Sequence, residues 1–331
     1  MKKFFAIFFL TLTAVFFTLI GFYFWASSPN LPEIRYNEVK ASEVPVKIPN
    51  DSVHSIITYN LGYLSGMTNN LPVEKPRSLF EENMNKVIRA LKQTDADIIS
   101  FQEIDFNANR SFYINQHEEI AKLGYPFSGL AVNWDKKYVP FPYFPFSVHF
   151  GKVISGQSVL SKYKILEQKR IALDRNPNNP FYYDTFYLDR LAQVLKIEVR
   201  NQILVLINVH LEAYNPSTRA KQMRQIKKLY MQYYKEFPTI LLGDFNSDVR
   251  FPDASIKLLL NLPKTGCVAF DPINSQNTFS SKVPEVRLDY IFYNEQFIKE
   301  ISGKVLHQFQ EASDHLPLLM KFKFKNQTLW N

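Results

Sequence analysis

Residues 239–246 read TILLGDFN, an apolar run that ends abruptly in polar side chains. A short apolar run bounded in this way is typical of a buried strand. Three further runs end alike, because SIITYN ends in Asn60, DIISFQE ends in Glu103 and ILVLINV leads into His210. If these strands share one edge of a sheet, their polar ends meet there.

The later part of the chain adds polar residues in the same position. Asp289 opens LDYIF, and Asp314-His315 precede the last apolar run, LPLLMKFKF. The predicted edge therefore collects carboxylate, amide and imidazole groups. Carboxylate and amide oxygens favour a hard cation such as Mg²⁺ over zinc. A divalent ion beside imidazoles and acidic groups can promote attack on a phosphate ester.

Each of these residues alone also has a structural explanation. Asn60 can form a turn, Glu103 can form a surface ion pair, and His210 can make a buried hydrogen bond. Asp289 and Asp314 can cap strands, and GDFN can be a tight turn. The functional hypothesis therefore depends on the ordered set.

Around these ends, apolar runs alternate with helical patterns. Apolar side chains recur at helical spacing in SLFEENMNKVIRALKQT, residues 78–94, and predict an amphipathic helix. A second helix is predicted over 217–234 and a weaker one around 113–123. Further predicted strands are KVISGQSVLS, KILEQKRIAL, LAQVLKIEV and QILVLINVH. Many strands with few helices predict an α/β fold of two packed sheets flanked by helices, in one domain over residues 53–323.

The ordered set resembles the endonuclease/exonuclease/phosphatase superfamily over essentially this whole domain. The motifs that carry the resemblance, in the family's order, are TYNLG, ISFQEID, GQSVLS, NVHLEA, LLGDFNS, RLDYIF and SDHLP. The resemblance implies a four-layer α/β/β/α sandwich of two mainly antiparallel sheets, with the site at one edge of the sheets. It also implies a metal ion, Mg²⁺ or Mn²⁺, with Glu103 as the principal ligand and Asn60 and Asp314 completing or supporting the metal shell.

The same resemblance implies roles for the remaining polar residues. Asp244 orients or deprotonates the attacking water, and Asn246 binds a phosphate oxygen. His315 contacts the scissile phosphate while paired with Asp289. His210 makes a second phosphate contact and is protonated if it assists the leaving group.

Residues 4–26, FFAIFFLTLTAVFFTLIGFYFWA, carry no charged side chain. As a helix the run spans about 34 Å, enough to cross a hydrocarbon core of about 30 Å. Lys2 and Lys3 precede it, so residues 1–3 are predicted to be cytoplasmic and everything after the span extracytoplasmic. We therefore expect a single-pass signal anchor in a membrane. A signal peptide that is cleaved near Ala26 is the alternative.

The segments that flank the domain are expected to be irregular. Residues 27–52 contain four prolines among charged side chains, and predict an extended linker that spans roughly 25–30 Å. Residues 324–331 are expected to form a C-terminal tail. The net charge of +8 fits attraction to phosphate-rich partners or anionic lipid, and a solvated basic surface explains it more simply. The single Cys267 excludes a disulfide scaffold and a Cys-rich zinc site.

Aromatic residues are dense in YVPFPYFPF, residues 138–146, and again in FYYDTFYLDR, residues 181–190. Prolines exclude a central strand, so the first stretch is expected to be a loop that contacts the bilayer or the substrate. A loop packed on its own domain is the alternative. The predicted substrate contacts lie in or beside these stretches: Tyr138, Phe141, Tyr143, Phe144, His149 and Arg190.

The predicted membrane span favours a lipid or a lipid headgroup as the phosphodiester substrate. The arrangement resembles the branch related to lipid remodelling of glycosylphosphatidylinositol anchors, and more loosely the neutral sphingomyelinases. An extracytoplasmic nuclease, with nucleic-acid bases stacked on the aromatic rings, is an alternative, as is a phosphomonoesterase of the inositol-phosphate type. A catalytically dead binding module would be expected to carry a broken site, and none of the motif positions is replaced.

Overall fold

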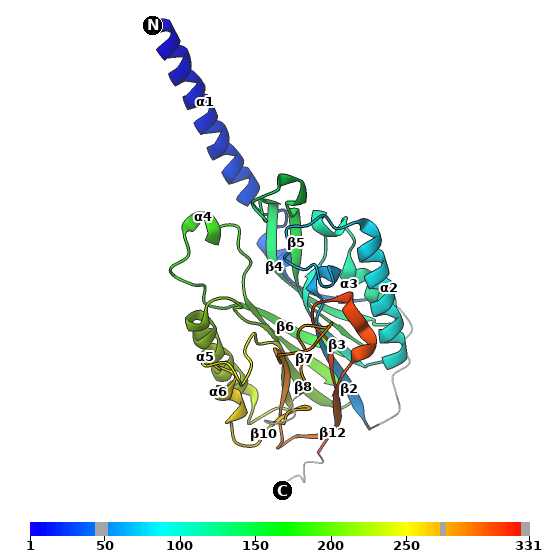
Figure 1. The fold of residues 1–331 in the computed structure, drawn as a ribbon. Helices are drawn as coiled ribbons and strands as arrows, with labels where there is room; N and C mark the ends of the chain where they lie inside the picture. The colour runs from blue at the N-terminus through cyan, green and yellow to red at the C-terminus, as the bar shows by residue number, and fades with distance from the viewer. Residues whose placement is uncertain (44–51, 272–275, 326–331) are drawn as a thin grey trace.

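Two β-sheets pack face to face at the centre of the chain (Figure 1). The computed structural model describes residues 1–43, 52–271 and 276–325. The first sheet has seven strands, in the spatial order β1 (Asn37–Ala41), β4 (Phe127–Val139), β5 (Gly151–Ser161), β3 (Ile98–Asp105), β2 (His54–Asn60), β13 (Leu318–Phe324) and β12 (Ile298–Val305). The second has six, in the order β10 (Thr265–Cys267), β11 (Asp289–Asn294), β9 (Thr239–Asp244), β8 (Gln202–His210), β7 (Leu191–Val199) and β6 (Lys164–Ala172). Paired strands within the described ranges run antiparallel, except that β2 with β3 and β8 with β9 are parallel.

Helices cover the outer faces of both sheets. α2 (Arg77–Thr94) and the short α3 (Gln116–Ala121) pack on the first sheet, and α5 (Pro216–Tyr233) and α6 (Lys257–Leu260) pack on the second. The predicted four-layer α/β/β/α sandwich is thereby confirmed. The other helical segments are α1 (Lys2–Ser27), α4 (Phe181–Asp184) and the 3₁₀ turns η1 (Glu33–Tyr36), η2 (Gly62–Leu64), η3 (Asn109–Ser111), η4 (Phe146–Val148) and η5 (His307–Ala312).

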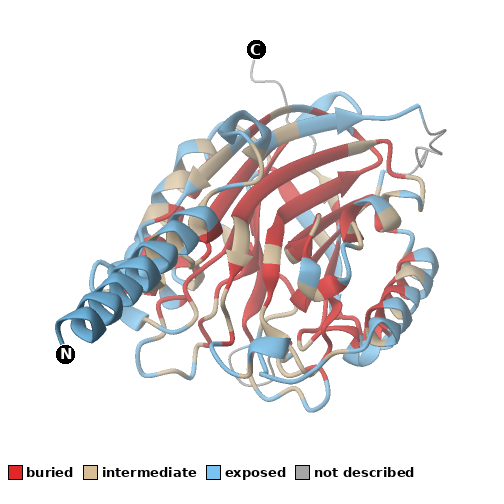
Figure 2. Cartoon of the chain, turned by 90° about the horizontal axis from the view of Figure 1, so that it is seen from above, coloured by how far each residue is buried: buried red, intermediate tan, exposed pale blue. Residues whose placement is uncertain are grey.

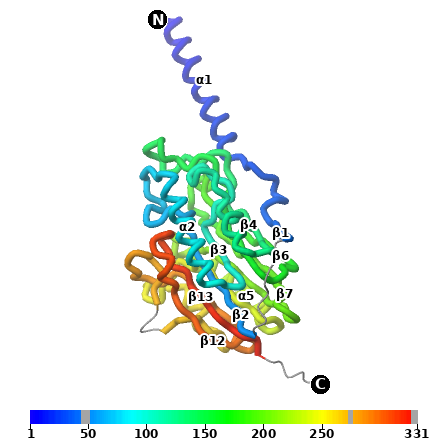
Figure 3. Tube along the Cα trace, turned by 90° about the vertical axis from the view of Figure 1, so that its right-hand side faces the viewer, coloured from blue at the N-terminus to red at the C-terminus, as the bar shows by residue number. Residues whose placement is uncertain are grey.

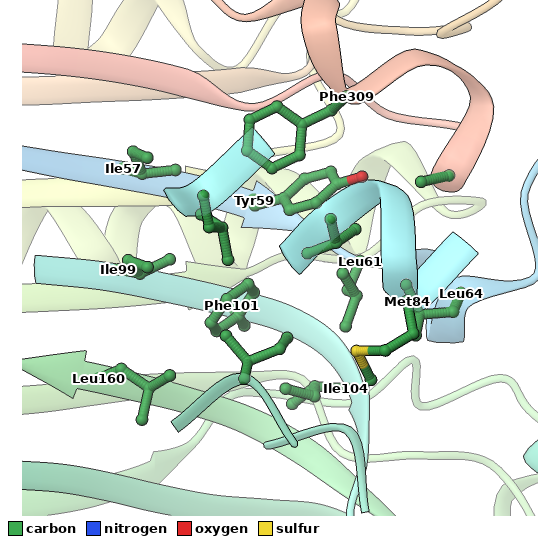
Figure 4. Close-up of a cluster of buried hydrophobic side chains, with 14 of the residues drawn as sticks. Ile57, Tyr59, Leu61, Leu64, Met84, Ile99, Phe101, Ile104, Leu160 and Phe309 are labelled. Atoms are coloured by element: carbon green, nitrogen blue, oxygen red, sulfur yellow. The ribbon is translucent and has the colours of Figure 1, made fainter. Parts of the chain in front are cut away.

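Strand alternation divides most of the buried side chains among three clusters, one between the sheets and one on the outer face of each sheet. Figure 2 shows the central strands buried along most of their length. In β2, Ile56 packs between the two sheets, whereas its neighbour Ile57 packs beneath α2. Successive strand residues point to opposite faces, so one apolar strand serves two layers. Figure 4 shows the layer beneath α2, where the rings of Tyr59 and Phe309 lie 5.2 Å apart. Both sheets are therefore packed on apolar side chains on each of their faces.

The predicted linker over residues 27–52 differs from the structure. Residues 37–41 form β1, an edge strand that pairs antiparallel with β4 from Asn37↔Ala131 to Ala41↔Phe127. The buried carboxylate of Asp135 accepts hydrogen bonds from the backbone N–H groups of Asn30 and Leu31, each at 2.8 Å. The segment after α1 is therefore tied to the domain and does not span the predicted 25–30 Å freely. Residues 44–51 of the predicted linker and 326–331 of the predicted tail lie outside the described residues.

Helix α1 projects from one end of the domain, opposite the C-terminal end of the described chain (Figures 1 and 3). It is long and apolar enough to cross a membrane. Its last turn contacts the domain directly, because Tyr23 Oη and Thr185 Oγ1 lie 2.8 Å apart and Ala26 is fully buried. The Lys136 ammonium donates to the Ser27 carbonyl at 3.0 Å. The apolar helix therefore leaves the domain from a defined position.

Candidate active site

The polar strand ends meet in one cavity of about 570 Å³. Its amide, charged and imidazole side chains come from both sheets and from the loops between them: Asn69, Asn70, Glu103, Arg190, His210, Arg219, Asp244, Asn246, Asp314 and His315. Asn60 and Asp289, each 1% exposed, lie behind this lining and contact Asp244 and His315 respectively. The predicted catalytic and metal residues are therefore brought together.

Strand register explains why these side chains meet. The parallel pair β8–β9 sets His210 opposite Asp244, and the antiparallel pair β9–β11 sets Asp289 opposite the same Asp244. In the first sheet, the parallel pair β2–β3 sets Asn60 opposite Gln102, one residue before Glu103. Because the two sheets pack face to face, the ends of both central strand pairs reach the same edge.

Two glycines in the motifs allow the chain to approach itself closely at this edge. A Cβ on Gly62, which has a φ of +51°, would lie 2.7 Å from Asp314 Oδ1. A Cβ on Gly243, with a φ of +136°, would lie 2.0 Å from the Val209 carbonyl oxygen. Only glycine tolerates such contacts together with a positive φ. TYNLG and LLGDFNS therefore need their glycines to bring β2 toward Asp314 and β9 toward β8.

Two site residues hold strained backbone conformations. Glu103 has a φ of +48° and Asn246 a φ of +49°, in the left-handed region that is uncommon outside glycine. Glu103 lies where the β3–β5 register shifts between Phe101 and Ile104, and such a bulge re-aims a side chain. Local strain of this kind concentrates at functional sites.

Glu103 and Asp314 form a pair of carboxylates on the cavity wall. The Asn69 side-chain amide donates to Glu103 Oε2 at 3.0 Å and lies 3.3 Å from Asp314 Oδ2, so it links the two. Burial, and then the negative charge of Asp314, raise the pKa of Glu103 above its usual value. A divalent cation would relieve this repulsion, and oxygen donors of this type fit Mg²⁺ or Mn²⁺. The residues present therefore fit the ion that the resemblance implies.

A second acidic group lies deeper in the site. The ligand atoms of Asp244, Asp289 and His315 gather within 4.8 Å of one another. His315 Nδ1 and Asp289 Oδ2 are 2.8 Å apart and hydrogen-bonded to each other, so each already uses one donor or acceptor atom. Burial alone lowers the pKa of His315, but the carboxylates of Asp289 and Asp244 outweigh it and raise that pKa well above the usual value. These carboxylates therefore favour the protonated imidazole at His315, whose Nε2 lies 3.9 Å from Asp244 Oδ2.

Asp244 is held by amides on both sides. Asn60 Nδ2 donates to its Oδ2 at 2.9 Å, and the Asn246 backbone N–H donates to its Oδ1 at 2.9 Å. Burial raises the pKa of Asp244 to about 7 against the opposing effect of His315. Asn60 Oδ1 accepts from the Gly62 backbone N–H at 3.1 Å. The structure therefore places Asn60 as the support of Asp244, behind the metal candidates.

His210 lies beside a buried arginine. Arg190, itself buried, donates a hydrogen bond from Nη1 to His210 Nε2. Burial, then the charges of Arg190 and His315, lower the pKa of His210 well below its usual value. This environment therefore favours the neutral imidazole at His210 and places a guanidinium charge beside it.

The six predicted substrate contacts divide into three groups. Phe141, Tyr143 and Arg190 line the cavity. Tyr138 and His149 instead hydrogen-bond to each other at 2.8 Å, and the Tyr138 ring packs on Phe22 and Trp25 of α1. Phe144 is 76% exposed on the surface. The aromatic loop therefore contributes both to the cavity and to the junction with α1.

Several lining residues were not predicted from the sequence. Asn69 lies in the loop GYLSGMTNNLP, where nothing in its spacing distinguishes it from a turn residue. Trp134 lies on β4, and the 181–190 stretch supplies Tyr183 and Tyr187. The aromatic density of that stretch was a usable signal for Tyr183 and Tyr187, whereas Asn69 gave none.

Known proteins share this arrangement of strands. A sequence model of the Endonuclease/Exonuclease/phosphatase family matches residues 57–315. The fold is similar to an endonuclease/exonuclease/phosphatase from Beutenbergia cavernae DSM 12333, with a TM-score of 0.61, 17% identity, and coverage of 83% of this chain and 72% of that one. It is also similar to the human Nocturnin catalytic domain with bound sulfate, with a TM-score of 0.57, 17% identity, and coverage of 89% of this chain and 100% of that one. No curated protein matches the chain in sequence.

A further similar structure is D. rerio TDP2 complexed with single strand DNA product. Its TM-score is 0.56, its identity 19%, and the coverage 82% of this chain and 100% of that one. At these identities the structural likeness shows the fold, and the family match covers most of the chain.

Proposed function

The chain belongs to the endonuclease/exonuclease/phosphatase family, and on that premise we propose that it is a membrane-tethered, divalent-metal-dependent phosphoesterase. It hydrolyses a phosphodiester by water attack, with a lipid or lipid headgroup as the favoured substrate. One observation carries the proposal: the polar strand ends form one end of a cavity whose aromatic wall contacts the apolar helix α1. Helix α1 remains attached, the N-terminus is cytoplasmic and the catalytic domain is extracytoplasmic.

Glu103 and Asp314 hold the ion, Mg²⁺ or Mn²⁺, in this proposal. Asn69 fixes the separation of their carboxylates, since its amide reaches both. When bound, the cation neutralises negative charge on the phosphate oxygens and polarises the phosphorus centre. Glu103 faces the cavity through its strained backbone, and this aim is fixed before the substrate arrives.

The remaining polar residues act on the water and the phosphate. Asp244 orients the attacking water and accepts its proton as the water oxygen bonds to phosphorus, which suits a carboxyl with a pKa of about 7. The phosphorus–oxygen bond to the leaving alcohol breaks in the same step, and solvent water protonates the alkoxide. His315 donates to a non-bridging phosphate oxygen through Nε2, because Asp289 holds its Nδ1. Preorganised donors of this kind stabilise the charge that develops in the transition state. Asn246 and Arg190 are further donors at the same end of the cavity.

The position of α1 favours a lipid substrate. Helix α1 leaves the domain beside the aromatic wall of the cavity, so a membrane lipid reaches the site without leaving its bilayer entirely. A nuclease is the second candidate, because the same aromatic wall could stack bases. A phosphomonoesterase is the third.

The test is a hydrolysis screen with the full chain in lipid nanodiscs and Mg²⁺ or Mn²⁺. Sphingomyelin, phosphatidylinositol derivatives, single- and double-stranded DNA and inositol phosphates are offered separately. We expect a lipid phosphodiester to be cleaved, and Glu103→Gln to lower turnover by at least about 100-fold. Cleavage that is equally fast in Glu103→Gln, or no cleavage of any ester, would contradict the proposal.

A further inference from the structure

We propose that the aromatic half of the cavity binds a hydrocarbon chain of the substrate, which enters from the membrane beside α1. The inference rests on the proposed phosphoesterase function and names its substrate class: an amphiphilic phosphate ester with at least one apolar chain. The phosphate lies at the polar strand ends, and the chain lies along the aromatic wall.

The aromatic wall is built from two segments of the protein. Strand β4 supplies Trp134, and the loop between β4 and β5 supplies Phe141 and Phe150, with ring centroids 5.9 Å apart for Trp134–Phe150 and 5.3 Å apart for Phe141–Phe150. The 181–190 stretch supplies Tyr183 and Phe186 from the other side. The whole cavity, at about 570 Å³, falls in the range of ligand pockets, roughly 300–1,000 Å³.

Hydrogen bonds join the two sides, so the wall is formed in advance. The Trp134 indole N–H donates to the Phe186 carbonyl at 2.8 Å. One residue before Trp134, the Asn133 amide donates to the Asp189 carbonyl at 3.1 Å, and the Asp189 N–H donates back to the Asn133 carbonyl at 2.9 Å. A preformed apolar pocket costs little conformational freedom when its ligand binds.

The wall also contacts the helix that we assign to the membrane. The Phe186 ring lies 5.7 Å from the ring of Tyr23 in α1, and the neighbouring Thr185 is hydrogen-bonded to Tyr23. Exposed aromatic rings lie on both loops beside this junction, since Phe144 is 76% exposed and Phe181 is 74% exposed. The apolar half of the cavity is therefore the half that lies toward the bilayer, and the catalytic half lies farther from it.

Charge pairing favours a hydrocarbon chain over a nucleic acid in this half. Arg110 is bound to Asp105 at 2.8 Å, Arg175 contacts Asp189 at 2.7 Å, and Lys136 donates to a backbone carbonyl. Of the two arginines that line the cavity, Arg219 donates to Asp253 at 3.0 Å, and Arg190 contacts His210 at the phosphate end. The basic side chains beside the wall are thus paired within the protein, whereas a nucleic-acid site needs positive charge along the whole phosphate backbone. The indole N–H of Trp134 is likewise occupied.

The test measures how affinity depends on chain length. The full-length protein in phosphatidylcholine nanodiscs is titrated in a calorimeter in the presence of Mg²⁺. The ligands are n-alkylphosphonates from methyl to hexyl, which remain in the water phase. We expect Kd to fall about fourfold for each added methylene until the wall is covered, because each buried methylene contributes a transfer term of that size. Phe141→Ser and Tyr183→Ser, which alter the two sides of the wall separately, should flatten the series while methylphosphonate affinity is kept.

Phe146→Ser is the matched control, because this ring is 73% exposed on the same loop and contacts Phe144 and His149. It should keep the wild-type series, which separates chain binding in the cavity from adsorption to the nanodisc. A flat series in the wild type, with methylphosphonate bound, would overturn the inference and leave the phosphoesterase proposal standing. Tighter binding of a nucleoside 5′-monophosphate than of hexylphosphonate would also overturn it. If none of the phosphonates bound, methylphosphonate included, the polar end of the cavity would not be a phosphate site. That result would contradict both proposals.

Discussion

Asn69 touches both carboxylates that we assign to the metal ion, although it is not itself assigned as a ligand. Asn69→Ala should lower the affinity for Mg²⁺ by about 10–100-fold, the usual effect of removing a hydrogen bond to a metal ligand. The Mg²⁺ dependence of hydrolysis and direct Mn²⁺ titration would measure it. Thr68→Ala is the control, since the Thr68 hydroxyl donates only to the Ser65 carbonyl in the same loop. Equal affinities in Asn69→Ala and the wild type would show that the carboxylates need no bridge.

Asp289 acts on the substrate through His315. The Asp289 carboxylate is the largest of the effects that raise the pKa of His315. Asp289→Asn should therefore lower the pKa of His315, and hydrolysis should fall by about 100-fold because the imidazole loses charge and orientation. An NMR titration of the histidine ring protons, with His315→Gln used for assignment, would measure the pKa. An unchanged pKa would mean that Asp289 has only a packing role.

At the scale of elements, regular apolar patterns predict helices and strands, whereas buried polar contacts between distant segments could not be predicted. Helix α2 was predicted because its apolar stripe, including Phe80 and Val87, is buried as the spacing requires. Strand β4 was not predicted, since FSGLAVNWDKKYV contains charged residues that are typical of a loop. Its Asp135 is nevertheless buried, because it binds Asn30, Leu31 and Tyr36 from the segment after α1. The linker prediction for residues 37–41 is wrong for the same reason, because the pairing of β1 with β4 joins positions far apart in the sequence.

The residues of the candidate site also divide into those that the sequence predicts and those that it does not. The residues at strand ends, such as Asp244 and His210, follow from the order of the motifs, because strand register alone brings them together. Asn69 and the Arg190–His210 contact depend on how loops fold back onto the sheets. Such contacts join positions far apart in the sequence, and a local pattern carries no information about them.

The junction of α1 with the domain bears on whether this helix is removed. Ala26 is fully buried, and the backbone carbonyls of Ser27 and Ser28 accept hydrogen bonds from Lys136 and Lys137. We expect the mature protein to retain α1, because the residues around the possible cleavage position are part of the folded domain. Mass spectrometry of the membrane-extracted protein should find the N-terminal segment. A mature chain that begins near Ser27 in the soluble exported fraction would contradict the anchor.

At the scale of the whole molecule, one buried histidine couples folding to pH. His117 in α3 is 2% exposed, and burial lowers its pKa to about 3 from an ordinary 6.5. The unfolded chain therefore binds a proton between about pH 6.5 and pH 3 that the folded chain does not, so stability falls as the pH falls through this window. At pH 5 this group should cost about 2 kcal/mol of unfolding free energy relative to pH 7.

His117→Phe should remove that part of the acid destabilisation. Melting temperatures of the wild type and the variant, measured from pH 7 to pH 4, would show a shallower decline in the variant. His307→Gln changes an exposed histidine and serves as the control. Parallel curves for His117→Phe and the wild type would show that His117 does not titrate differently in the folded state.

At the same scale, α1 leaves the domain near β4, β5 and α4 (Figure 1), and the aromatic residues of the cavity wall come from β4, from the loop after it and from the stretch around α4. The central claim is that the polar end binds a divalent ion between Glu103 and Asp314. Anomalous X-ray scattering from a crystal of the protein soaked in Mn²⁺ tests it most directly. The account predicts an anomalous peak within about 2.1 Å of carboxylate oxygens of both Glu103 and Asp314. A peak on Asp244, Asp289 and His315 instead, or no peak in the cavity, would contradict it.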